Sequence, residues 1–218
     1  MKKYGLTIVL LALFFISVLG QVHSGLKTYN DDRIQEGLLP LQSYNEYVRS
    51  GHFISSLAEN MESEFLQMAL FVLLSVFLYQ RGSSESKKLP EDMTNEDREK
   101  ERLEEEYCRK KRKDNPVIFG LYQNSLTVVL IAFFLIFFLL HAGGSFRLIN
   151  EERATEGKAA IAFTEVFAQD EFWFESFQNW QSEFFSVASL GVLSIFLRQK
   201  GSPQSKKMRD PNWKTGSE

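Results

Sequence analysis

The residues of this sequence that could do chemistry are polar side chains inside two apolar segments. They form a candidate intramembrane polar site of Asn60, Ser63, Glu64, Gln67, Asn179, Ser182, Glu183 and Ser186. Most of them are three or four positions apart, so each set predicts a polar stripe along one face of an apolar helix. An ionised carboxylate at the bilayer centre costs about 2.5–3.5 kcal/mol on insertion scales. Glu64 and Glu183 should therefore face protein, water or the membrane interface, or be protonated.

Three kinds of function fit this stripe. In a structural seam, its amides and hydroxyls hydrogen-bond across helices, each bond adding roughly 0.6 kcal/mol. Glu64 and Glu183 then pair with the candidate loop partners Arg33 and Arg153. In a small channel or transporter, the two carboxylates carry protons or cations along a polar pathway. In a membrane enzyme, they act as general acid and base. We expect a structural or interaction role first and a pathway second.

Other catalytic chemistry has little support in the sequence. His23, His52 and His141 each lack a second histidine or a cysteine at ligand spacing. Cys108 is the single cysteine and forms no internal disulfide. The sequence also lacks a glycine-rich phosphate-binding loop. We therefore expect no enzyme activity, no catalytic residue, no metal site and no cofactor.

The segment that carries the stripe occurs twice in the sequence. Residues 53–88 return as residues 172–207, with an Asn-x-x-Ser-Glu-Phe motif, an apolar run and a basic, serine-rich tail in each copy. Residues 6–10 likewise match residues 126–130, which lie deep inside the chain. This match favours a retained transmembrane helix near the N-terminus over a cleaved signal peptide.

A polar motif also recurs after the first apolar run of each copy. Residues 30–37 and 150–157 both read Asn, two acids, Arg, two variable residues, Glu and Gly. We interpret each motif as a short helix capped by its Asn, with acids in the first turn and Gly as the stop. The alternative is that Arg33 and Arg153 pair with a buried carboxylate.

These repeats predict an all-α integral membrane protein with four transmembrane helices, arranged as a tandem parallel duplication of a two-helix hairpin. The first two-span repeat covers residues 1–88, and the second covers residues 117–207. Between them, residues 89–116 form a charged cytoplasmic linker that we expect to be helical. Residues 208–218 form a cytoplasmic tail.

Lysine and arginine lie mainly on one side of this four-span arrangement. The positive-inside rule then places both termini in the cytoplasm. We expect the protein to lie in the plasma membrane. The lipid bilayer is the main expected partner. The expected contacts with anionic headgroups come from Arg109, Lys110, Lys111, Arg112 and Lys113. The net charge of −3 points to no nucleic-acid partner, and a homodimer is compatible with four short spans.

Together, these motifs resemble a bacterial family of integral membrane proteins catalogued as a domain of unknown function (DUF6766-like). The likeness rests on residues 60–65 and 179–184, on the two basic tails and on the Asn-acid-acid pattern. It covers nearly the whole chain. The chain departs from the family pattern at Met61, where Trp is more usual, and at Ser84, where Pro is usual. The resemblance implies a membrane fold, a location in the bacterial inner membrane and no particular activity.

Overall fold

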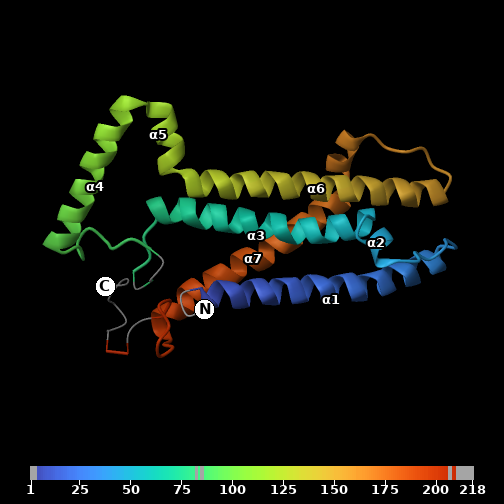
Figure 1. Cartoon of the computed structure of the whole chain (residues 1–218), viewed down its shortest axis with the longest axis horizontal. Helices are drawn as coiled ribbons and strands as arrows, with labels where there is room; N and C mark the ends of the chain where they lie inside the picture. The colour runs from blue at the N-terminus through green and yellow to red at the C-terminus, as the bar shows by residue number, and fades with distance from the viewer. Residues whose placement is uncertain (1–3, 82, 84–85, 206–207, 210–218) are drawn as a thin grey trace. The chain divides into compact units, whose positions relative to one another are not determined.

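A computed structural model describes residues 4–81, 83, 86–205 and 208–209, and this part of the chain contains helices and loops but no strand (Figure 1). In chain order the elements are α1 (Gly5–Gln35), α2 (Tyr44–Tyr47), α3 (Gly51–Phe77), α4 (Asn95–Asp114), α5 (Pro116–Gln123), α6 (Ser125–Thr155), the 3₁₀ helix η1 (Phe163–Ala168) and α7 (Asp170–Phe196). The predicted all-α class is confirmed.

Three of the described helices, α1, α3 and α6, are long and apolar enough to cross a membrane. The helices α1 and α6 have 31 residues each, whereas a hydrocarbon core of about 30 Å needs roughly 20. The helix α7 has 27 residues, as α3 does, but acidic residues make it less apolar. Three helices of this kind indicate a membrane protein.

The chain divides into two compact units. The first unit comprises Met1–Met61 and Ile136–Ser176, and the second comprises Glu62–Leu135 and Phe177–Glu218. The helices α3, α6 and α7 each contribute one part to the first unit and another part to the second. Each unit therefore contains segments from both copies of the sequence repeat.

An aromatic cluster of Tyr29, Tyr47 and Phe53 forms one half of the core of the first unit. Tyr47 lies on the short helix α2, and its side chain is 1% exposed. A Cβ atom on Gly25 would lie 2.1 Å from the Tyr47 hydroxyl oxygen, so α1 needs a glycine where α2 packs on it. Burial also raises the pKa of the Tyr47 hydroxyl.

A second cluster in the same unit surrounds Ala142, Val166 and Phe172, none of them more than 1% exposed. Val166 belongs to η1 and Phe172 to the first turns of α7, and both pack against α6. The indole N–H of Trp173 donates a hydrogen bond of 2.9 Å to the carbonyl of Phe167. This bond fixes the turn from η1 into α7 and so sets the direction in which α7 leaves.

The same hydrogen-bonded loop follows α1 and α6. The side-chain amide of Asn30 donates to the carbonyl of Leu41 at 3.0 Å and accepts from its N–H at 2.7 Å. Asn150 makes the same two bonds with Ile161, at 3.5 and 2.8 Å. One asparagine therefore closes each loop through both of its polar side-chain atoms.

Gly37 and Gly157 end these two helices with φ angles of 76° and 69°, in the left-handed conformation that glycine adopts without strain. The interpretation of residues 30–37 and 150–157 as separate short helices is wrong. Each motif forms the last turns of a long helix, because no proline interrupts the chain between the apolar run and the glycine. Asn30 and Asn150 therefore bond forward to a loop and do not cap the N-terminus of a helix.

Small residues let the backbones of α3 and α6 approach closely in the first unit. A Cβ on Gly144 would lie 2.4 Å from the Ser55 nitrogen, and one on Gly51 would lie 2.7 Å from the Gly144 carbonyl oxygen. Beside this contact the buried hydroxyls of Ser55 and Ser145 are 2.8 Å apart. Close approach through small residues is a common way for membrane helices to pack. It brings the next turn of α3 up against α6.

In the second unit, α4 is an exposed, charged helix. The hydroxyl of Thr94 caps its N-terminus by accepting from the N–H of Asp97, whose carboxylate accepts from the Thr94 N–H at 3.0 Å. The hydrogen bonds from Thr94, with a further one from Lys88, lower the pKa of Asp97 to about 2. The helix ends at Asn115, whose side chain caps α5, and Figure 1 shows the sharp turn between the two helices.

The segments that follow α3 and α7 also share a hydrogen-bonding pattern. The hydroxyl of Ser86 accepts from the N–H of Gln80 at 3.0 Å and donates to its carbonyl at 2.9 Å. Ser205 makes the same two bonds with Gln199, at 2.9 and 3.0 Å. A serine six residues after the glutamine closes the loop in both places.

Candidate functional site

The predicted polar stripe lies on α3 and α7, and its members differ in exposure. Ser63 and Gln67 are buried, Asn179 and Glu183 are half-buried, and the exposed members are Asn60, Glu64, Ser182 and Ser186. Some of these side chains bond to their own helix. The side-chain amide of Asn60 donates to the backbone carbonyl of Ser56 at 2.7 Å. The hydroxyl of Ser186 donates to the backbone carbonyl of Ser182 at 2.9 Å. These two bonds do not join helices.

The stripe does bring its two glutamates together in the second unit. The side chain of Glu183 interacts directly with that of Glu64. The two carboxyl groups therefore lie next to each other between α3 and α7.

Arg33, one of the two predicted loop partners, forms an ion pair with Glu151 in the first unit. The hydroxyl of Tyr29 donates to the same carboxylate at 2.9 Å. The side chain of Arg33 is 14% exposed and that of Glu151 is 39% exposed, so the pair lies at the edge of the packed region. The carboxylate that Arg33 contacts thus belongs to α6 and not to the polar stripe.

Both predicted arginines also bond to the backbone of their own loops. Nε of Arg33 donates to the carbonyl of Leu39 at 2.9 Å, and Nε of Arg153 donates to that of Ala159 at 2.7 Å. The two bonds are equivalent in the sequence repeat. Loop closure is therefore the role that the two arginines share, and the ion pair is an addition at Arg33.

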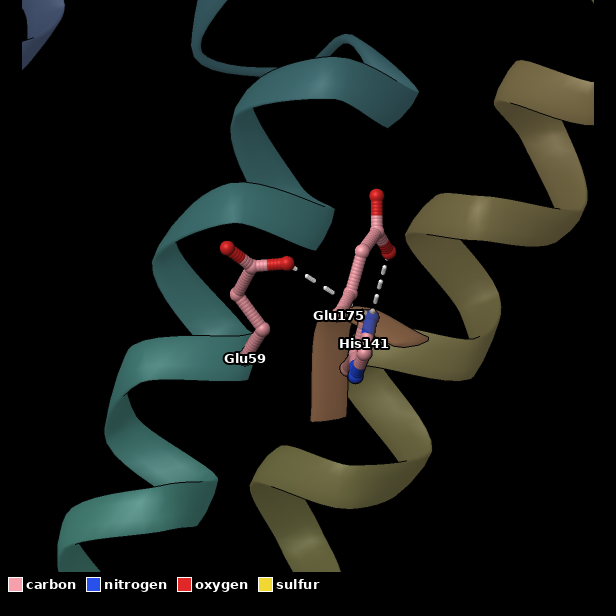
Figure 2. Close-up of side chains that lie close together, drawn as sticks. All are labelled: Glu59, His141 and Glu175. Carbon is pink, nitrogen blue, oxygen red and sulfur yellow. Dashed lines mark hydrogen bonds and ion pairs between the residues drawn. The ribbon is translucent and has the colours of Figure 1, made fainter. Parts of the chain in front are cut away.

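Three side chains that belong to no sequence motif lie close together in the first unit. They are Glu59 of α3, His141 of α6 and Glu175 of α7 (Figure 2). Nε2 of His141 lies 3.2 Å from Oε2 of Glu175 and 3.8 Å from Oε2 of Glu59. One polar atom of each residue lies within 4.8 Å of the others. His141 is 0% exposed, and the side chains of Glu59 and Glu175 are 19% and 34% exposed. The imidazole is therefore fully buried, whereas both carboxylates are partly exposed.

The packing of three helices holds this cluster in place. The ring of Phe172 stacks on the imidazole of His141 with their centroids 4.5 Å apart. Glu175 follows Phe172 by three residues, so the two side chains lie on the same face of α7. Glu59 lies one turn beyond Ser55, the residue at which α3 comes closest to Gly144 of α6. The contacts that form the core of this unit therefore also position the cluster.

At the equivalent place the first copy of the repeat holds a neutral pair. Gln21 precedes His141 by 120 positions, and Ser56 precedes Glu175 by 119. The side-chain amide of Gln21 donates to the hydroxyl of Ser56 at 3.2 Å, the same distance as the contact between His141 and Glu175. The two copies therefore have the same contact, uncharged in one and ionisable in the other.

Sequence reasoning missed this cluster because its members lie on three different helices. Spacing rules for ligands apply to residues close together in the chain, whereas Glu59 and Glu175 lie 82 positions before His141 and 34 after it. Comparison of the two copies offered a signal. Glu59 corresponds to Gln178, and the equivalents of His141 and Glu175 are also uncharged. Ionisable residues that occur in only one copy are not required by the packing of the repeat.

The cluster allows two kinds of chemistry. Two carboxylates beside the same imidazole nitrogen can both accept a bifurcated hydrogen bond from its N–H. Alternatively, the nitrogen and the carboxylate oxygens can bind a divalent cation, for which both are common ligands. The expectation that the chain has no metal site stays a prediction.

These features place the chain in the class of all-helical membrane proteins with polar side chains buried between their helices. The chain belongs to the family described as Domain of unknown function (DUF6766), whose model matches residues 1–217. No curated protein and no solved structure matches it. Membership confirms the resemblance seen in the sequence and assigns no activity.

Proposed function

We propose that this protein is a multi-pass membrane protein with a structural or interaction role, built from four spans as a parallel tandem duplication of a two-helix hairpin. The observation that carries this proposal is the repetition of local hydrogen bonds. Asn30 and Asn150 bind their loops in the same way, and Ser86 and Ser205 close the same turns. Matching bonds 119 or 120 positions apart support a duplicated unit more directly than similarity of sequence does.

The helix α7 is the fourth span in this proposal. It has the same length as α3 and follows η1 as α3 follows α2. Its first-turn acids suit a helix N-terminus at the membrane edge. Glu175 contacts His141, and Glu183 contacts Glu64, so neither carboxyl has to face lipid.

The linker helix α4 and both termini lie in the cytoplasm in this arrangement, in agreement with the positive-inside rule. The last turn of α4 carries Lys111, Arg112 and Lys113, whose charges attract anionic headgroups. The exposed length of α4 also offers a surface to a partner protein or to a second copy of the chain. We place the interaction role of the protein on this helix.

Polar contacts between helices support the structural part of the proposal. Within the first unit, Arg33 pairs with Glu151, and the hydroxyl of Ser55 bonds to that of Ser145. Each contact joins residues about 90 or more positions apart in the sequence. Polar side chains that bond to a neighbouring helix stabilise membrane helix packing by roughly 0.6 kcal/mol each.

Cysteine labelling tests the four-span arrangement. Cys108 is the single native cysteine and lies on α4, so an impermeant maleimide should modify the wild type only after the membrane is opened. In a Cys108→Ser background, Lys158→Cys should react in intact cells, and Lys200→Cys only after opening. Reaction of these two cysteines from the same side would exclude α7 as a span.

A second candidate function is a small proton- or cation-coupled pathway. The observation that favours it is the contact between the side chains of Glu64 and Glu183. Ionisable pairs inside membrane helices commonly mark proton and ion routes. The same pair would also join α3 to α7 in a structural seam. The two functions therefore differ in whether loss of the pair lowers stability or abolishes ion flux.

The double variant Glu64→Gln/Glu183→Gln separates the two functions. If the pair is structural, the variant should melt at a lower temperature than the wild type, and neither protein should move ions in liposomes. If the pair is a pathway, the variant should melt like the wild type while only the wild type carries flux. Ser186→Ala is the matched control, because Ser186 lies on the same stripe and bonds to its own helix.

A further inference from the structure

We propose that Glu59, His141 and Glu175 form a binding site for one divalent transition-metal ion of the Zn²⁺ class. The structural role proposed above does not require such a site, so the two proposals stand or fall separately. The inference rests on the geometry of the three side chains, on their charge and on the neutral pair in the other copy.

The geometry is close to that of a metal site with three protein ligands. A tetrahedral Zn²⁺ ion with bonds of about 2.0–2.2 Å holds its ligand atoms roughly 3.3–3.5 Å apart. Nε2 of His141 lies 3.2 Å from an oxygen of Glu175 and 3.8 Å from an oxygen of Glu59. In Figure 2 both carboxylates turn an oxygen toward the imidazole. All three ligand atoms lie within 4.8 Å of one another, so the side chains would have to draw together slightly around an ion.

The charge of the cluster also favours a divalent ion. Two carboxylates carry two negative charges, and a single proton on His141 offsets only one of them. Charged groups in a packed interior are usually paired or bound to a metal. A divalent cation offsets both charges and lets all three side chains keep a bond. One nitrogen and two oxygen ligands suit Zn²⁺ or a similar first-row ion.

The equivalent place in the first copy indicates that packing alone does not need the charges. There, Gln21 and Ser56 fill the positions of His141 and Glu175 with a neutral hydrogen bond of 3.2 Å. A neutral pair avoids the desolvation cost of ionisable groups, and a bound cation would account for their presence in the second copy. Water reaching the open side of the cluster would complete four-coordination.

The repeat supplies variants that should fold. His141→Gln with Glu175→Ser copies the Gln21–Ser56 pair into the second copy, and Glu59→Gln copies Gln178 into the first. His23→Gln is the matched control, because His23 is an exposed histidine of α1 that bonds to the hydroxyl of Tyr44. Each variant is made in the full chain and purified in detergent without a polyhistidine tag.

Zn²⁺ binding is measured by calorimetry and by metal content after dialysis, and Co²⁺ absorption reports the coordination geometry. We expect about one Zn²⁺ per chain in the wild type and in His23→Gln. Loss of one ligand in Glu59→Gln, and of two ligands in His141→Gln/Glu175→Ser, should weaken binding at least about tenfold. Absence of stoichiometric binding by the wild type would refute the site. Unchanged affinity in Glu59→Gln would also refute it, and this single variant decides the matter if the double variant fails to fold.

Discussion

Ionisable residues make different contacts in the two copies of the repeat. Arg33 and Arg153 both bond to their own loops, but only Arg33 also pairs with a carboxylate, Glu151. Tyr29, which bonds to the same carboxylate, corresponds to Ile149 in the second copy. Single substitutions therefore have effects that depend on the copy in which they are made.

Glu151→Gln should lower the free energy of unfolding by about 1–2 kcal/mol. The substitution removes the negative charge that faces Arg33. The expected loss of free energy lies between those measured for buried and for exposed ion pairs, because Glu151 is 39% exposed. Chemical denaturation in detergent measures the change. Lys158→Gln is the control, since it breaks a fully surface-exposed pair with Glu156 and should cost less than about 0.5 kcal/mol. Equal losses of unfolding free energy in the two variants would contradict a stabilising ion pair between Arg33 and Glu151.

At the level of helices, the contact between α3 and α6 depends on the glycines Gly51 and Gly144. Gly144→Ala should destabilise the protein by about 1–3 kcal/mol, because the new Cβ would meet the Ser55 backbone at 2.4 Å. Gly143→Ala should be neutral or slightly stabilising, because nothing lies within 4 Å of a Cβ there. Thermal melts of both variants test this, and similar melting temperatures would mean that the helices do not approach as described.

The N-terminus of α4 should respond to acid. The pKa of Asp97 is lowered from 3.8 to about 2 by hydrogen bonds from Thr94 and Lys88, so the ionised carboxylate stabilises the cap above about pH 4. This stabilisation is lost as the pH falls toward 2. The carboxyl resonance of Asp97, followed by NMR, should titrate near pH 2 in the wild type. In Thr94→Ala it should titrate somewhat closer to its ordinary value, because the hydroxyl bond is lost while the backbone N–H at position 94 and Lys88 still donate. Identical titration in both proteins would exclude the Thr94 hydroxyl as a cause of the lowered pKa.

Limited proteolysis tests how the whole molecule holds together once the linker is cut. Trypsin should cleave the exposed, lysine- and arginine-rich α4 before it cleaves the packed helices. In the first unit, residues before and after the linker are in contact, as at Ser55 and Ser145. The two fragments should therefore co-elute in mild detergent. Early separation of the fragments would mean that the linker alone keeps the copies together.

The sequence alone predicted the elements whose formation depends on nearby residues. Apolar runs predicted α1, α3 and α6, the charged linker predicted a helix where α4 lies, and Gly37 and Gly157 predicted helix ends. Each of these depends on residues within a few positions of one another. Local chemistry is present in the sequence and needs no knowledge of packing.

Features that depend on packing could not be predicted in the same way. The cluster at His141 forms because Gly144 lets α3 approach α6 and because η1 turns Phe172 onto the imidazole. Neither condition has a local signature in the chain. The extension of α1 through Asn30 was also missed, because asparagine is common at helix ends and its forward bonds to Leu41 depend on the loop.

The proposed joining of two hairpins in one chain has a consequence for symmetry. Two identical hairpins related by a two-fold axis would repeat every residue, so they would hold either two histidines or none at the equivalent positions. In a single chain each position can change alone, and this chain has Gln21 with Ser56 at one pair of positions and His141 with Glu175 at the matching pair. A ligand that needs His141 and Glu175 would therefore bind at one site per chain and not at two.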